Sequence, residues 1–171
     1  AVEPSVVVVN SFSKYFGMTG WRLGWLVLPE ALVDVVERLA QNLYISPPTV
    51  AQHAALAAYA PQTLEICEER RMRFWNRREI MLDGLAKAGL EAALKPDGAF
   101  YVYVDIESTG LDAETFCWRM IEEEHVAITP GTDFGENDAN HFVRLAFTTD
   151  EKRIETGMTR LADAVARFRE E

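Results

Sequence analysis

The sequence has 171 residues, of which 49% are hydrophobic and 26% are charged. This composition is typical of a soluble globular protein and excludes a disordered or fibrous one. No apolar run approaches the roughly 20 residues that span a bilayer, so we expect neither a membrane segment nor a signal peptide, and a cytoplasmic location. The net charge of −10 opposes contact with nucleic-acid phosphates, which excludes nucleic acid as a partner.

The first residues indicate an α/β arrangement. The β-branched run Val6–Val9 predicts a strand buried on both faces, as in parallel sheets covered by helices. Residues 10–20 are rich in Ser and Gly and predict a loop, and Trp21–Leu28 predicts a second apolar strand. A lone buried strand is unstable. We therefore expect the other strands of the sheet to come from upstream sequence or from another polypeptide.

Three helices are predicted next. The first covers residues 29–43 and begins with a proline, which the first helical turn tolerates. Ser46 or Thr49 is expected to cap the Ala-rich segment that follows. Residues 62–88 carry one apolar stripe of a long helix that Gly89 would end. A helix of that length commonly bridges two domains, so we expect domains at residues 1–61 and 62–171.

The remaining sequence predicts a small α+β domain. We expect strands at residues 92–95, 99–106, 126–129 and 142–147 and a helix over residues 112–124. Thr148 and Glu151 form a predicted capping box for a last helix. Its apolar stripe consists of Ile154, Met158, Leu161, Val165 and Phe168.

The loop between the first two predicted strands contains the densest pattern of chemically useful residues, which reads S-F-S-K-Y-F-G-M-T-G-W-R-L-G over residues 11–24. A lysine that follows a buried strand lies at a sheet edge, partly desolvated, where its pKa can fall and the free amine of Lys14 can attack an aldehyde. Arg22 opens the next strand and can return its guanidinium to the same place, where its planar fork suits a phosphate.

A second candidate lies in the predicted strand near the C-terminus. Alternation places Arg144 on the face of Phe142 and Ala146, so its guanidinium lies among apolar side chains and requires an anion. The same pattern is explained equally well by a charge that protects an edge strand from pairing with another chain. Tyr15, Tyr44 and Tyr101 could line a pocket, but aromatic residues on apolar elements are more often core, so none is taken as a site residue.

Residues 11–24 resemble the Schiff-base signature of the class I and II aminotransferases, which are pyridoxal-phosphate-dependent enzymes of fold type I. The resemblance implies that Lys14 binds the cofactor pyridoxal 5'-phosphate through a Schiff base. It also implies that Arg22, Ser11 and Ser13 bind the cofactor phosphate, with Ser11 favoured over Ser13. Residues 126–145 resemble the stretch of the family that ends in the arginine for the substrate carboxylate, a role that falls to Arg144.

The resemblance implies a fold as well as a reaction. Residues 1–61 would be the later part of the large α/β domain, truncated at its N-terminus, and residues 62–171 the interdomain helix with the small α+β domain. The reaction would move an amino group between an amino acid and a 2-oxo acid, with Lys14 as tether and base. The intact protein would be a homodimer, and this chain alone an incomplete, poorly active fragment.

Three alternatives stay open at this point. The same signature occurs in lyases and synthases of this fold, in the aminotransferase-like domain of some transcription regulators, and in non-catalytic relatives. No metal site is expected, because His53, His125 and His141 lack ligand spacing. Acidic, aromatic and aliphatic amino acids all remain possible substrates.

Overall fold

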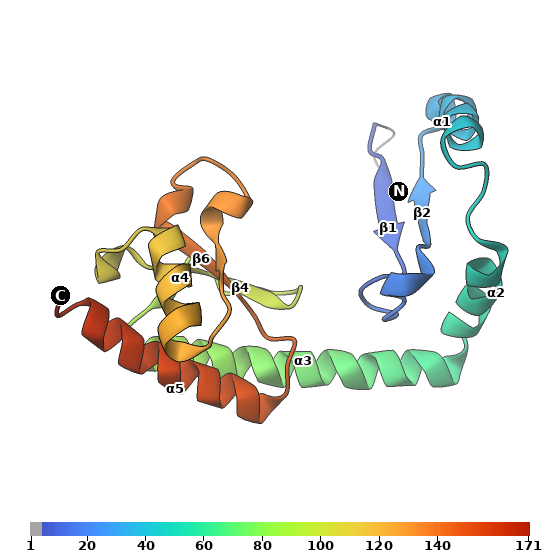
Figure 1. Cartoon of the computed structure of the whole chain (residues 1–171). Helices are drawn as coiled ribbons and strands as arrows, with labels where there is room; N and C mark the ends of the chain where they lie inside the picture. The colour runs from blue at the N-terminus through green and yellow to red at the C-terminus, as the bar shows by residue number, and fades with distance from the viewer. Residues whose placement is uncertain (1–4) are drawn as a thin grey trace. The chain divides into compact units, whose positions relative to one another are not determined.

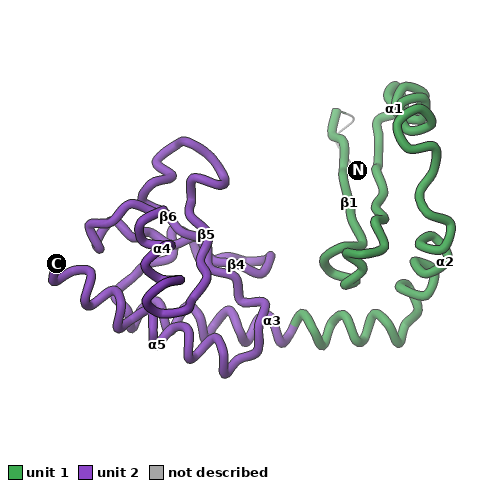
Figure 2. Tube along the Cα trace, viewed as in Figure 1, with its two compact units in different colours: residues 1–71 green, residues 72–171 purple. Residues whose placement is uncertain are grey.

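The computed structural model describes residues 5–171, which form two compact units that divide after residue 71 (Figure 2). Helix α3 (Pro61–Lys87) contributes residues to both units. The domain boundary predicted between residues 61 and 62 lies at the start of this helix, whereas the units divide within it. That boundary stays a proposal, and the two units are described separately.

Unit 1 begins with two short strands, β1 (Val8–Ser11) and β2 (Gly24–Val27), which pair in antiparallel fashion. The loop between them contains a short 3-10 helix, η1 (Thr19–Trp21). Gly24 lies opposite Ser11 in the register, and a Cβ atom at this glycine would lie 2.5 Å from the carbonyl oxygen of Asn10. The two strands therefore approach each other at a point where only glycine fits.

Within the described residues, the first strand is not buried on both faces as predicted. The strand begins at Val8 rather than Val6, it runs antiparallel to β2, and Val9 is 74% exposed. A continuous β-branched run indicates a strand suited to a covered sheet. Within residues 5–171, no second layer covers both faces of this pair, so the side chains remain accessible.

Two helices complete most of unit 1, α1 (Glu30–Leu43) and α2 (Thr49–Ala58) (Figure 1). The predicted caps of α2 were wrong, because the residue at its N-cap is Pro48 and no side chain accepts a bond there. A proline with φ of −55° is already set for the turn into a helix and has no N–H to satisfy. The main buried cluster of this unit is small and comprises Phe12, Met18, Ala55 and Ala58.

Unit 2 is built on a four-stranded sheet in the order β3-β4-β6-β5, in which every neighbouring pair is antiparallel. The strands are β3 (Glu91–Ala92), β4 (Tyr101–Asp105), β5 (Thr129–Pro130) and β6 (Phe142–Ala146). Short 3-10 helices lie in the connections at η2 (Glu107–Thr109), η3 (Gly131–Asp133) and η4 (Ala139–His141). The small α+β domain predicted from the sequence is present.

The core of unit 2 lies between this sheet and the helices α3, α4 (Ala113–Glu124) and α5 (Glu151–Phe168) (Figure 1). The apolar stripe predicted for the last helix is confirmed, since all five of its residues are buried. Helices α3 and α5 are in close contact at Gly84, where a Cβ atom would overlap the side chain of Met158. Both cysteines, Cys67 and Cys117, are buried free thiols.

The cap of the last helix differs from the predicted one. Asp150, not Thr148, is the N-cap of α5, and its carboxylate accepts a hydrogen bond from the backbone N–H of Arg153 at 3.0 Å. Asp112 caps α4 in the same way, accepting from the backbone N–H of Thr115 at 2.9 Å. A charged aspartate is a strong acceptor for the unpaired N–H groups of a first turn.

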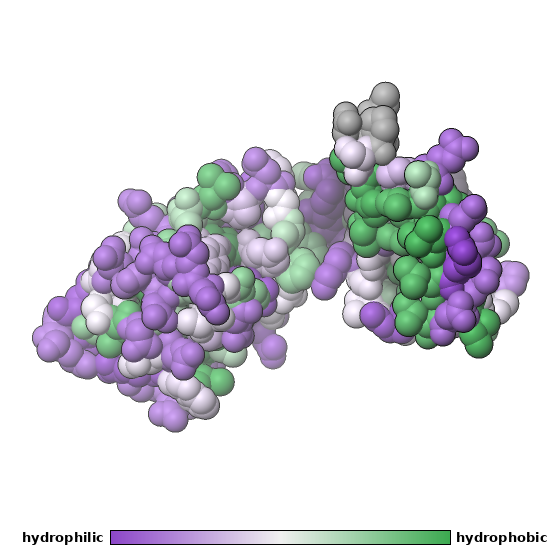
Figure 3. Space-filling view, turned by 90° about the horizontal axis from the view of Figure 1, so that it is seen from above, coloured by the Kyte–Doolittle hydropathy of each residue, from purple (hydrophilic) through white to green (hydrophobic). Residues whose placement is uncertain are grey.

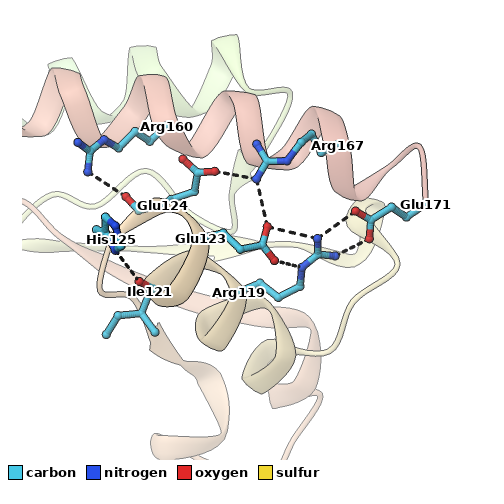
Figure 4. Close-up of polar contacts among 8 residues, drawn as sticks. All are labelled: Arg119, Ile121, Glu123, Glu124, His125, Arg160, Arg167 and Glu171. Atoms are coloured by element: carbon cyan, nitrogen blue, oxygen red, sulfur yellow. Dashed lines mark hydrogen bonds and ion pairs between the residues drawn. The ribbon is translucent and has the colours of Figure 1, made fainter.

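Charged side chains link α4 to α5 on the surface of unit 2 (Figure 4). Arg119 donates to Glu123 at 2.7 Å and to Glu171 at 2.6 Å. Arg167 donates to Glu124 at 2.7 Å and to Glu123 at 3.2 Å. The two helices thus share a network of alternating charges rather than isolated ion pairs. Over residues 5–171, no helix combines the length and apolarity needed to cross a bilayer.

Candidate active site

Lys14 lies in the loop that joins β1 to β2, and this loop is closed by its own backbone. Phe12 donates to the carbonyl of Leu23 and accepts from the N–H of Met18, both at 3.0 Å. Gly17 donates to the carbonyl of Lys14 at 3.0 Å, in a turn that requires its φ of 67°. The Lys14 side chain is exposed, so the described residues do not supply the predicted partial desolvation.

The other predicted residues of unit 1 belong to the same hydrogen-bonded loop. The Ser11 hydroxyl oxygen accepts from the N–H of Ser13 at 3.0 Å. The Thr19 hydroxyl donates to the carbonyl of Ser13 at 2.8 Å, and Nη1 of Arg22 donates to the carbonyl of Thr19 at 2.7 Å. Thr19 therefore links the arginine to the two serines. This role of Thr19 was not predicted, because a hydrogen bond between residues six positions apart leaves no local sequence pattern.

The backbone at Arg22 is in the left-handed region, with φ of 52°. A residue other than glycine, asparagine or aspartate is uncommon there and marks a position that its surroundings fix. A guanidinium has five N–H donors, and the bond to Thr19 uses one of them. Ser11, Ser13 and Arg22 thus bring hydroxyl and guanidinium groups into one loop, a donor set that fits a phosphate such as that of pyridoxal 5'-phosphate.

Arg144 lies in unit 2 on β6, which is an inner strand with β4 on one side and β5 on the other. The alternative of a protective charge on an edge strand is therefore wrong. The guanidinium carbon lies 4.2 Å from the ring centre of Phe134 and 5.1 Å from that of Tyr101. The Nε atom is buried and, among the described residues, has no hydrogen-bond partner. A buried donor without an acceptor favours binding of an anion.

The rings of Phe134 and Tyr101, which lie beside Arg144, were not predicted as site residues. Tyr103 is the direct partner of Arg144 in the register, and Tyr101 is the diagonal neighbour on the same face. Alternation along one strand cannot reveal this placement, because it depends on how two strands are aligned. Four predicted residues, Ser11, Ser13, Lys14 and Arg22, are thus grouped in unit 1, and Arg144 belongs to unit 2.

A cavity of about 820 Å³ lies in unit 1 between β1, β2, α1 and the segment that follows it. Its wall is mainly apolar and includes Trp25, Leu26, Val33 and Tyr44. Arg22 also contributes to the wall, whereas Lys14 does not. The lining therefore offers the polar groups of a cofactor little to bind, and the hydrogen-bonded loop is the better candidate for the phosphate.

Comparison with known proteins agrees with this geometry. The family model of the aminotransferases of class I and II matches residues 1–161, and the chain belongs to this family. It is 40% identical, over 92% of its length, to a valine–pyruvate aminotransferase of Mycobacterium tuberculosis, and 33% identical, again over 92%, to a (5-formylfuran-3-yl)methyl phosphate transaminase of Methanocaldococcus jannaschii. It covers 40% and 41% of these two relatives.

Solved structures show the same relationship. The crystal structure of an aminotransferase from Mycobacterium tuberculosis matches 96% of this chain with a TM-score of 0.93 and 38% sequence identity, and the match covers 43% of that protein. The fold is therefore that of the later part of the large α/β domain of these pyridoxal-phosphate-dependent transferases, followed by the small α+β domain. The chain spans about two fifths of the length of the relatives it matches.

Proposed function

We propose that this chain carries the cofactor lysine, the phosphate donors and the substrate-carboxylate arginine of an aminotransferase that moves an amino group between an amino acid and a 2-oxo acid. The observation that carries the proposal is the hydrogen-bonded loop in which Ser11, Ser13 and Arg22 surround Lys14 in sequence and are joined through Thr19. Membership of the aminotransferase family supports it.

Each side chain has a distinct task in this proposal. Pyridoxal 5'-phosphate, when bound, supplies an aldehyde and a conjugated ring that withdraws electrons from the substrate. The Nζ atom of Lys14 attaches the cofactor and, once released, takes the proton from the substrate α-carbon. Arg22, Ser11 and Ser13 hold the phosphate. Arg144 holds the substrate carboxylate with two parallel N–H donors and so orients the α-carbon for proton transfer.

The substrate side chain is left open by this proposal. The relatives named above act, by their names, on valine with pyruvate and on a furan phosphate, so family membership alone does not specify a substrate. A homodimer and a cytoplasmic location stay predictions. Since the chain spans only about two fifths of its relatives, we expect the 171-residue chain to show little turnover by itself.

The proposal is tested by trapping the cofactor on its lysine. The chain is mixed with pyridoxal 5'-phosphate and reduced with borohydride, and the added mass is mapped to a peptide. We expect one main adduct at Lys14, which Lys14→Arg abolishes. Lys95→Arg removes another exposed lysine, which is paired with Glu79 at 3.4 Å, and should leave the adduct unchanged. Labelling spread evenly over surface lysines would contradict the role of Lys14.

A further inference from the structure

The residue that follows the candidate cofactor lysine is bonded to a distant helix. The hydroxyl of Tyr15 donates to Oε1 of Glu68 at 2.8 Å, across 53 positions in the sequence. Glu68 belongs to α3, and its other carboxylate oxygen accepts from Nε of Arg71 at 2.8 Å. The carboxylate is thus fixed on one side by its own helix and binds the loop with the other oxygen.

The aromatic ring of Tyr15 is held by packing, in addition to the hydrogen bond made by its hydroxyl. The ring meets Phe16 edge to face, with 5.0 Å between the ring centres and 87° between the planes. Phe16 in turn lies 5.0 Å from the ring of Phe12 and 5.3 Å from that of Tyr59. Tyr15 is therefore restrained at both the ring and the hydroxyl, and each restraint acts on the residue next to Lys14.

The backbone of the same turn also lies close to α3. A Cβ atom at Gly17 would be 3.3 Å from Nη1 of Arg70. The Lys14 turn thus lies near the helix that provides Glu68.

From these contacts we propose that Tyr15 and Glu68 are positioning residues for Lys14. Their hydrogen bond holds the turn that contains Lys14 against α3. The Lys14 side chain therefore extends from the loop in one defined direction. This inference rests on the proposed role of Lys14 as the cofactor lysine. It adds that the reactivity of Lys14 depends on the hydrogen bond between Tyr15 and Glu68, although neither residue is proposed to contact the cofactor or the substrate.

The ionisation states support the bond. The Arg71 guanidinium, and after it the Tyr15 hydroxyl, lowers the pKa of Glu68 below its usual value. The same bond to Glu68 raises the pKa of Tyr15. At neutral pH the carboxylate is therefore charged and the phenol is protonated, which are the states that the donor and the acceptor require.

The first measurement is amide hydrogen exchange of the chain without cofactor. The N–H groups of Gly17 and Met18 are bonded within the loop and report its opening. Tyr15→Phe and Glu68→Ala each remove the bond, and we expect these two amides to exchange about three- to tenfold faster, the range of one net hydrogen bond. Glu68→Gln keeps an acceptor oxygen and should preserve slow exchange.

Tyr44→Phe is the matched control, since it removes an exposed tyrosine hydroxyl from the same unit. Unchanged exchange of the α2 amides in each variant shows that the fold of unit 1 is intact. Wild-type exchange at Gly17 and Met18 in Tyr15→Phe would overturn the inference.

The second measurement is the rate at which pyridoxal 5'-phosphate is trapped on Lys14 by borohydride. Tyr15→Phe should slow trapping by a similar factor, and Glu68→Gln should restore most of it. Faster loop exchange with an unchanged trapping rate would overturn the positioning role. Absence of any Lys14 adduct in the wild-type chain would instead refute the proposed function, while the exchange data would still show whether the bond holds the loop.

Discussion

Arg144 is the residue that we propose binds the substrate carboxylate. Its guanidinium lies beside the rings of Phe134 and Tyr101, which attract a cation without using its hydrogen-bond donors. A carboxylate from the protein would hold the side chain as firmly but would occupy those donors. Aromatic support therefore holds the charge in place without occupying the N–H groups that, in the proposed role, bind a carboxylate.

This arrangement predicts a large effect of Arg144→Lys. A lysine keeps the charge but cannot form two parallel bonds to a carboxylate. We expect pyruvate, titrated into the chain and followed by NMR, to bind the variant about tenfold more weakly or worse. Arg160→Lys changes an exposed arginine that donates to the carbonyl of Glu124, and it should bind as the wild type does. Equal binding by Arg144→Lys would contradict the role of Arg144.

The residue types of the candidate site were predictable, but their supports were not. Lys14, Arg22 and Arg144 stand out because a charged group in an apolar or glycine-rich pattern needs a chemical reason. Thr19 and Phe134 could not be predicted as supports, because their contacts depend on loop closure and strand alignment. Sequence patterns report the side chain that needs a partner more readily than the partner itself.

At the scale of elements, the contact between α3 and α5 depends on Gly84, which has no side chain. Gly84→Ala would place a methyl group where Met158 lies, and we expect the free energy of unfolding to fall by about 1–3 kcal/mol. Gly157, within α5, has open space around the position that a Cβ atom would take. Gly157→Ala should therefore raise the free energy of unfolding by about 0.5–1 kcal/mol. Denaturant unfolding of unit 2 measures both changes. The same sign for the two substitutions would contradict the packing described here.

The charge network between α4 and α5 predicts a dependence of stability on pH. Arg119 is the main cause of the lowered pKa values of Glu123 and Glu171. A lowered pKa means that the stabilisation is fully present above the usual carboxyl pKa of 4.5 and is lost as the pH falls through the lowered values. We expect Arg119→Gln to lower the Tm at pH 7, and this difference from the wild type to shrink towards pH 3.

Two further observations sharpen that experiment. Arg119 also lies over the ring of Phe168 at 4.1 Å, so part of its effect will not depend on pH. Arg153→Gln is the matched control, because its pair with Asp150 spans 3.7 Å and its side chain is 79% exposed. A Tm difference for Arg119→Gln that stays constant from pH 7 to pH 3 would show that the network contributes nothing.

The elements themselves were predictable to different degrees. Long helices with one apolar stripe, such as α3 and α5, were found close to their true bounds because period and burial agree. Caps were harder, since Thr148 and Asp150 both suit the start of α5 and only the backbone decides between them. The strand β5 is short, and the predicted strand at residues 126–129 overlaps it at a single residue.

At the scale of the whole molecule, the two units differ in how much apolar surface they bury. Unit 2 has a continuous core, whereas the buried cluster of unit 1 consists of Phe12, Met18, Ala55 and Ala58. Apolar side chains also gather on the surface of unit 1 (Figure 3), among them Val9, Leu26, Val27, Leu39 and Leu43. Apolar surface that stays in water contributes nothing to stability.

We therefore expect unit 1 to open more readily than unit 2. Amide exchange of the 171-residue chain should be fast over residues 8–58, outside the bonds of the lysine loop, and slow over β4, β6 and α5. Mild denaturant should expose unit 1 first, which a dye for apolar surfaces would report. Equal protection of the two units would contradict this ranking.

The exposure of β1 is the main departure from the predicted fold within the described residues. The valine run is suited to a covered sheet, and the sequence predicted that the other strands of that sheet come from upstream sequence or from another polypeptide. The chain spans about two fifths of the relatives it matches, and within residues 5–171 no such layer is found. A pattern of side chains records the environment to which a strand is adapted, which need not be contained in the sequence at hand.

The bond between Tyr15 and Glu68 has a practical consequence. Because it raises the pKa of Tyr15, this phenol loses its proton at higher pH than an ordinary tyrosine. Phenolate formation changes ultraviolet absorbance, so the difference between the wild type and Tyr15→Phe in an alkaline titration isolates one optical signal. The loop that carries the candidate cofactor lysine thus contains an intrinsic chromophore, and its docking can be followed without attaching a label.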